Sequence, residues 1–127
     1  MQGKHLYEYA VIRLVPRVER EEFFNVGIIL FSKRAKYIKA LYKVDEDKLN
    51  LFSSELDRES LFANLHVFDK ICSGTKEGGP IAALDIPERF RWLTAVRSAS
   101  IQTSRPHPGF PDDLDQTLEI LFRELVL

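Results

Sequence analysis

The side chains best suited to bind an anion gather between residues 87 and 111. Arginines outnumber acidic residues there, and a guanidinium can hold phosphate or carboxylate through two hydrogen bonds. A rigid Pro-His-Pro-Gly-Phe-Pro loop adds an imidazole that could form one wall of a site. The same arginines could instead only solvate a helix, so both interpretations stay open. The candidate anion-binding residues in this segment are Arg89, Arg97, Ser98 and His107.

A second charged cluster lies between two apolar stretches, at residues 13–25. Arg13 interrupts an otherwise apolar stretch, and a buried arginine needs a partner because an isolated charge in the interior is costly. Glu21 or Glu22 could supply it, and the ion pair would then fix a connection between strands. The alternative is a ligand site, whose candidate residues are Arg13, Glu22 and Asn25.

A basic segment with interleaved tyrosines spans residues 33–43. Basic and aromatic side chains together can bind nucleic acid, but lysines at a hairpin also protect strand edges. Eighteen Lys and Arg against nineteen Asp and Glu give a net charge of −1. No overall positive field therefore attracts nucleic acid, and we expect this class of partner only as a second alternative.

The three histidines and the one cysteine lack the spacing of a zinc motif. His66 and Asp69 could share a ligand, although a half-buried structural histidine explains the same pattern. Cys72 falls on the apolar side of an expected helix, where a buried thiol is inert. The glycines match neither a phosphate-binding nor a dinucleotide-binding loop. We therefore expect no metal and no cofactor.

The hydrophobic pattern predicts three strands in the first part of the chain. They cover residues 6–15, 26–31 and 37–44, and their short links suggest an antiparallel meander. The first strand is apolar on both faces, which suggests a central position. Gly27 follows the start of the second strand, where a glycine typically marks a bulge or a close approach of another backbone.

Helices are predicted in the remainder, over residues 57–73, 87–96 and from Asp112 or Asp113 to the C-terminal end. We also expect a short edge strand at 81–84, an extended piece at 101–103 and no regular structure at 106–111. Strands and helices are thus segregated along the chain. The expected fold class is α+β, with an antiparallel sheet of three to four strands packed against about three helices, in a single domain of residues 1–127.

Location follows from cysteine usage and hydropathy. A lone cysteine cannot form an internal disulfide, which is typical of a reducing compartment. The longest wholly apolar run, Val26–Phe31, is far shorter than the ~20 residues that a membrane-spanning helix requires. The N-terminal segment has neither the apolar region nor the cleavage site of a signal peptide. We expect a cytoplasmic protein without membrane contact.

Two sets of motifs resemble an uncharacterised bacterial family catalogued as domain of unknown function 3037. The first set is Tyr9-Ala10-Val11-Ile12-Arg13, then Pro16-Arg17, then Glu22-x-x-Asn25-x-Gly27-Ile28-Ile29-Leu30. The second is Arg89-Phe90-Arg91-Trp92-Leu93-x-x-x-Arg97-Ser98, with Gln102-Thr103-Ser104, His107 and Gly109. The match spans nearly the whole chain.

The resemblance implies a role as an accessory protein. Members of the family are often encoded beside proteins resembling HipA-type kinases, so the implied partner is a HipA-like kinase. No catalytic residue carries over, because none is assigned in the family. Both sets of motifs overlap the charged clusters, which favours a site that includes Arg13, Glu22, Asn25, Arg97 and His107.

The leading hypothesis is therefore an accessory domain that binds a protein partner and, in addition, a small anionic ligand. Ile120 and Leu127 would supply the partner surface, or a homodimer interface, because they lie opposite the expected buried stripe of the final helix. That stripe is Leu114, Leu118, Leu121 and Leu125.

The first alternative is a small phosphate-processing or nucleotide-binding enzyme, so the sequence leaves open whether the protein is an enzyme. Arg97 and Arg89 would hold the anion, Glu22 would act as base and His107 as proton donor.

Overall fold

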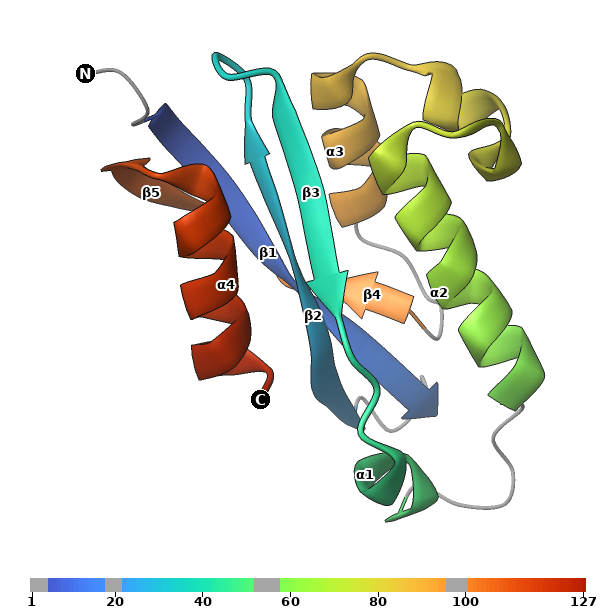
Figure 1. Ribbon diagram of the computed structural model, residues 1–127. Coiled ribbons are helices and arrows are strands. Elements are labelled where there is room, and N and C mark those ends of the chain that lie inside the picture. Colours follow the sequence, from blue (N-terminus) through green and yellow to red (C-terminus); the bar gives the residue numbers. More distant parts are fainter. Residues whose placement is uncertain (1–4, 18–21, 52–57, 96–100) are drawn as a thin grey trace.

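The computed structural model describes residues 5–17, 22–51, 58–95 and 101–127. Strands β1 (His5–Arg17), β2 (Glu22–Ser32) and β3 (Tyr37–Tyr42) form the predicted antiparallel meander. Strands β4 (Ile101–Thr103) and β5 (His107–Asp112) both pair antiparallel with the other edge of β1. The central position of β1 and the α+β class are therefore confirmed (Figure 1).

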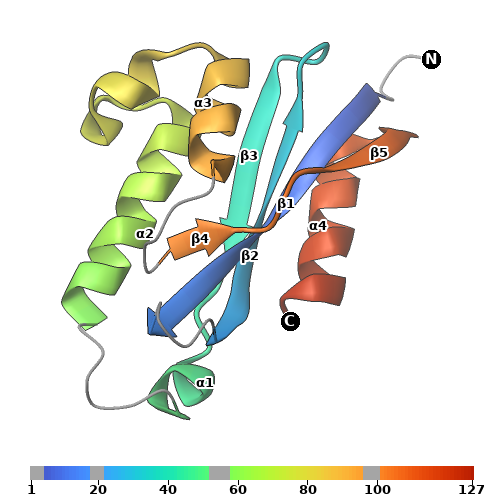
Figure 2. The ribbon, with the colours of Figure 1, turned by 180° about the vertical axis from the view of Figure 1, so that it is seen from behind.

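The helices cover both faces of the sheet (Figures 1 and 2). On one face lie α1 (Glu46–Leu51), α2 (Arg58–Ser73) and α3 (Ile86–Thr94), and on the other lies α4 (Leu114–Leu125). Two short 3₁₀ helices, η2 (Lys76–Gly78) and η3 (Pro80–Ala83), connect α2 with α3. The described residues thus form three layers, with the sheet in the middle.

The ends of the helices follow the expected capping chemistry. Gly74 ends α2 with φ +74°, a conformation that suits glycine. Asp85 precedes α3 and its carboxylate accepts a hydrogen bond from Glu88 N at 3.0 Å. Asp113 precedes α4 in the same way and accepts from Gln116 N at 3.0 Å. Asp57, the expected cap of α2, lies outside the described residues.

Two local predictions are wrong, and proline is the cause in both. Residues 81–84 form no strand, because Pro80 starts the 3₁₀ helix η3 and Leu84 N donates to Ile81 O. Residues 106–111 are not irregular, because most of them form β5. An edge strand needs N–H donors on one side only, so Pro108 is tolerated opposite Glu8.

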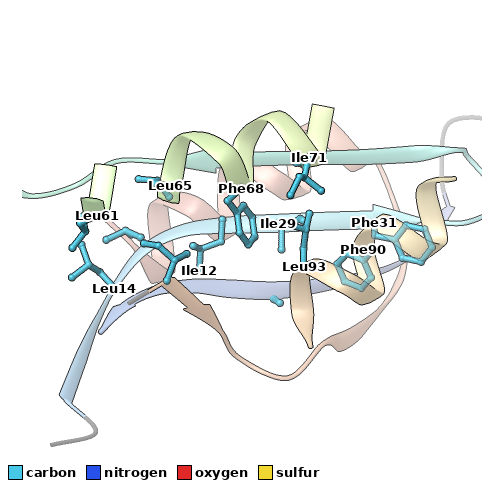
Figure 3. Packing of buried hydrophobic residues seen from close by; sticks show 14 of the residues in the cluster. Ile12, Leu14, Ile29, Phe31, Leu61, Leu65, Phe68, Ile71, Phe90 and Leu93 are labelled. Carbon is cyan, nitrogen blue, oxygen red and sulfur yellow. The ribbon is translucent and has the colours of Figure 1, made fainter. Parts of the chain in front are cut away.

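The larger apolar cluster lies between the sheet and α2 and α3, as Figure 3 shows. Alternate residues of β1 point into it, and Phe31 of β2 stacks on Phe90 of α3 with ring centroids 4.7 Å apart. Apolar residues of α2 at helical spacing face the sheet, whereas Phe62 is 39% exposed. The cluster includes Ile12, Leu14, Ile29, Leu61, Leu65, Phe68, Ile71 and Leu93.

The smaller apolar cluster lies under α4 and corrects the predicted stripe of that helix. Leu114 and Leu118 are buried as expected, but Leu125 is 38% exposed. Leu121 packs partly against the cluster, as expected. Phe122 and Val126 also face inward, in place of Leu125, because four-residue steps from Leu118 lead to them. Ile120 and Leu127 point away from the sheet and are exposed.

A β-bulge in β2 controls the register of the central strands. Ile12 pairs with Gly27 and Arg13 with Asn25, so Val26 is an extra residue in β2. The bulge lets both Val26 and Ile29 face the larger cluster. A Cβ on Gly27 would lie 2.6 Å from Leu41 O, so the close approach of β3 requires glycine.

The contact between Tyr37 and Asp115 joins α4 to β3 and generates a prediction. The Tyr37 hydroxyl donates to Asp115 Oδ1 at 2.7 Å, and Lys39 Nζ lies 3.8 Å from the same atom. Tyr37→Phe should lower the free energy of unfolding by about 1 kcal/mol in urea titrations. Tyr42→Phe is the control, since the Tyr42 hydroxyl has no hydrogen bond among the described residues, and it should change stability by less than about 0.5 kcal/mol.

The same contact predicts a pH dependence. Burial, followed by Asp115, raises the pKa of Tyr37 above its usual value of 10.0. The unfolded chain releases this proton near its ordinary pKa while the folded protein retains it, so the stabilisation is complete below that pH and is lost above it. Wild type should therefore lose stability more steeply than Tyr37→Phe above about pH 10. Parallel curves would contradict this role of Tyr37.

Candidate functional site

Two of the candidate residues predicted from the sequence meet on the α4 face of the sheet. Arg13 and Asn25 are direct cross-strand partners, and the Arg13 guanidinium carbon lies 4.2 Å from the centroid of the Phe23 ring. Asn25 Nδ2 donates to Leu125 O at 2.9 Å, which holds the C-terminal end of α4 against the sheet. Asn25 is thus engaged in a structural contact, and Arg13 in a cation–π contact.

Alternation along β2 assigns Glu22 and Arg13 to opposite faces of the sheet. Alternation along β2 places Glu22 on the face of Phe24, whose side chain belongs to the larger cluster. Arg13 lies on the opposite face, with Phe23. The Arg13–Glu22 ion pair stays a prediction, and Glu21 lies outside the described residues.

His107 lies on the α4 face but away from Arg13. Its ring packs on Tyr9, with the centroids 5.3 Å apart, and it is the register partner of that residue. Arg13 is four residues further along β1, about 13 Å at roughly 3.3 Å per residue. The side chains of Arg13 and His107 therefore do not converge directly.

Arg89 lies on the other side of the sheet. It is a residue of α3, and its guanidinium packs so closely on Gly74 that a Cβ there would overlap it. A cation at this place interacts favourably with the C-terminal end of α2. Because the sheet separates Arg89 from His107, an enzyme that uses both at one reacting centre has no support in this arrangement. Arg97 and Ser98 lie outside the described residues.

The other chemically reactive groups have structural surroundings. Cys72 is 3% exposed, and burial, followed by Asp69, raises its pKa to about 12 against a weaker opposing effect of Arg89. It is therefore a thiol at neutral pH and a poor nucleophile. Two residues of the basic 33–43 segment, Tyr37 and Lys39, contact Asp115 on α4.

The larger of two hollows combines parts of two segments that the sequence singled out separately. It has a volume of about 370 Å³ and lies where β1, β5 and the turn between β2 and β3 come together. Lys33 and Arg34 contribute positive charge, and Glu8 contributes one carboxylate. Leu6, Phe31 and Pro108 supply apolar surface. It combines apolar and cationic groups in one concave region.

Two exposed apolar side chains border this hollow. Phe110 is 89% exposed and Leu6 is 64% exposed. Phe110 directly follows Gly109, which lines the hollow. It lies opposite Leu6, at the register shift between the Tyr7–Gly109 and His5–Asp112 pairs. We name the set Leu6, Glu8, Lys33, Arg34, Pro108 and Phe110 the sheet-end surface. In the sequence, its signals were the Pro-His-Pro-Gly-Phe-Pro segment and the basic 33–43 segment, which contributes Lys33 and Arg34.

A second hollow of about 230 Å³ lies between α2, α3 and β4. It is lined mainly by apolar groups, with Val67 and Trp92 partly exposed at its border. Its polar lining residues, Asn64 and Gln102, both have interaction partners. This groove has no charged side chain in its lining, so it indicates less about a ligand than the sheet-end surface does.

Neither a metal-binding cluster nor a membrane-spanning helix occurs among the described residues. Among the described residues, no three His, Cys, Asp or Glu side chains lie close enough together to hold a metal ion. Within the same ranges, every helix falls short of the length and apolar character needed to cross a membrane.

Tyr7 and Gly109 hold β5 in place at this surface. They are cross-strand partners, and the Tyr7 ring covers Gly109 so closely that a Cβ would overlap it. Burial raises the pKa of Tyr7, with smaller contributions from Asp112 and Tyr9. The aromatic cover fixes the strand that carries Phe110.

This packing generates a double-mutant prediction. Gly109→Ala should lower the free energy of unfolding by about 1–3 kcal/mol, because the new methyl group must displace the Tyr7 ring. Tyr7→Leu removes the ring, so the double variant should lose less than the sum of the two single variants. Urea unfolding of all four proteins measures this coupling. Additive losses would show that Tyr7 does not cover Gly109.

Comparison with known proteins identifies a family but no relative of assigned activity. A family model described as "Protein of unknown function (DUF3037)" matches residues 9–126, which is nearly the whole chain. No curated protein and no solved structure matches the chain. The matched region includes β1 from Tyr9 onward, with its Arg13, the bulge of β2, α3 and the strand that carries Phe110. The chain belongs to the DUF3037 family of proteins of unknown function, as its motifs indicated.

Proposed function

We propose that this chain is an accessory domain that binds a protein partner through the sheet-end surface. The observation that carries the proposal is the exposure of Phe110, at 89% of its surface. Its strand pairs with β1 and is covered by Tyr7, so the ring is held outward by ordered backbone. Aromatic side chains exposed beside other apolar groups are typical of protein-binding surfaces.

The position of the surface supports this proposal over the C-terminal helix. Ile120 is 39% exposed, and it has no hollow beside it among the described pockets. Leu6, in contrast, lines a hollow into which a partner side chain can insert, and Phe110 directly follows Gly109 of the same lining. The HipA-like kinase suggested by the family resemblance is the first partner to test.

A small anionic ligand is the second candidate at the same surface. The hollow of about 370 Å³ falls within the usual volume range of ligand pockets, and Lys33 and Arg34 could hold a carboxylate or phosphate. A thermal-shift panel of small carboxylates and phosphates tests this candidate. A rise in melting temperature that Arg34→Ala removes supports it, and no shift across the panel rejects it.

Photo-cross-linking can test the docking proposal in cells that naturally make the protein. A benzoylphenylalanine at position 110 should form a discrete cross-link with one partner, and the same group at position 120 should not. The captured protein is then purified and titrated against wild type, Phe110→Asp and Ile120→Asp. Phe110→Asp should weaken binding at least about tenfold, because it places a charge in an apolar contact.

The control outcomes separate the two surfaces. Phe110 is so exposed that its replacement should leave the melting temperature nearly unchanged, which thermal unfolding verifies. Cross-linking at position 120, with loss of binding only in Ile120→Asp, would assign the interface to α4 and overturn the proposal. Equal affinity of all three proteins for the captured partner would also overturn it.

A further inference from the structure

Charge restricts what can dock on the sheet-end surface. Lys33 and Arg34 line the hollow, whereas Glu8 is the one acidic residue in its lining. Among the described residues, the cations of the ion pairs lie elsewhere, at Lys39, Arg58, His66 and Lys70. Asp112 is the other nearby acid, and it acts on Tyr7. The unpaired cations favour carboxylates on the docked group.

The backbone of β5 restricts how a partner can attach. β5 is an edge strand, and its sequence His-Pro-Gly-Phe-Pro-Asp contains two residues without an N–H group. Pro108 and Pro111 cannot donate to an added strand, so strand addition along this edge is unfavourable. The partner must therefore bind mainly through side chains that lie on the face of the sheet.

The helical layer leaves part of that face uncovered. Phe31 is covered by Phe90 of α3, whereas Leu6 and Phe110 are exposed on the β1 and β5 side. In Figure 2, α3 lies beside β3, and β5 lies at the opposite edge of the sheet. A helix placed over Leu6 and Phe110 would extend the layer formed by α2 and α3. Sheets typically bury an exposed apolar face under such a helix.

We propose that the partner segment is an amphipathic helix with acidic residues on its flanks, an inference that rests on the docking function proposed above. Its apolar side chains, spaced three and four residues apart, contact Leu6, Pro108 and Phe110 and insert into the hollow. Its carboxylates lie against Lys33 and Arg34. The inference names the chemistry of the partner, which the docking proposal alone leaves open.

A displayed peptide library tests this chemistry directly. The library consists of 16-residue helical peptides with fixed apolar residues at positions i, i+3, i+4 and i+7, and with Glu, Gln or Lys at each flanking position. Selection against wild type, after depletion on Phe110→Asp, should enrich Glu at the flanks. An enriched peptide is then synthesised and titrated by fluorescence polarisation.

Charge reversal provides the matched variants. Lys33→Glu combined with Arg34→Glu should weaken binding of the enriched peptide by about tenfold or more, through a slower association rate. Lys43→Glu is the control, because Lys43 is exposed after the far end of β3, and it should change affinity less than about twofold. Raising the salt concentration should weaken binding to wild type and to Lys43→Glu, but much less to the double variant.

Each outcome bears on one proposal. Enrichment of Gln or Lys at the flanks, or unchanged affinity of the double variant, would overturn the acidic chemistry. Failure of any helical peptide to bind above the Phe110→Asp background would overturn a helical occupant. The docking function is judged separately by the cross-link at position 110, so a failed peptide selection with a positive cross-link rejects only this further inference.

Discussion

The structure depends on the burial of β1 at both edges and on both faces. One edge pairs with β2 over most of its length, and the other pairs with β4 and then with β5. Ala10, Ile12 and Leu14 point to the α2 and α3 layer, whereas Val11 points to α4. Side chains of this one strand thus enter both apolar clusters. A polar residue within it must therefore be accommodated by a specific contact.

Two such contacts explain the polar residues near the centre of the sheet. Arg13 lies over Phe23, where its charge faces an aromatic ring, and the bulge at Val26 brings Asn25 opposite it. Ser104 directly follows β4, in the segment that leads to β5. Its hydroxyl accepts a hydrogen bond from Val11 N at 2.8 Å and donates one to Arg105 O. That hydroxyl replaces a main-chain partner at the break between the two strands. Arg13, Asn25 and Ser104 therefore each have a structural role in the fold.

The sheet-end surface arises where the central strand loses its helical cover. Toward its N-terminal end β1 still has neighbours on both edges, so the strand remains ordered. The α2 and α3 layer does not extend over Leu6 and Phe110, which are consequently exposed. The turn that joins β2 to β3 adds Lys33 and Arg34 beside them. Rigid backbone, apolar exposure and positive charge thus coincide in a region that no single motif of the sequence marked.

Local sequence patterns correctly predicted those strands and helix ends that are determined by neighbouring residues. Alternation and apolar runs predicted the first three strands, and the caps Asp113 and Gly74 placed helix ends correctly. The β5 strand was missed because proline disfavours regular structure locally, while pairing with β1 and the cover of Gly109 by Tyr7 stabilise it across the chain. Leu125 was assigned to the buried stripe because the rotation of α4 about its axis depends on what it packs against.

For the candidate site, too, local sequence predicted some features and packing between distant segments decided the others. By itself, the sequence determined the residue types, the family, and an α+β chain with a central first strand, because these follow from local pattern and motif. Only the tertiary structure decided that Arg89 lies on the opposite side of the sheet from His107, and that Asn25 holds α4. It also decided which apolar residues stay exposed. Side-chain direction and burial result from how distant segments pack, and no short stretch of sequence contains that information.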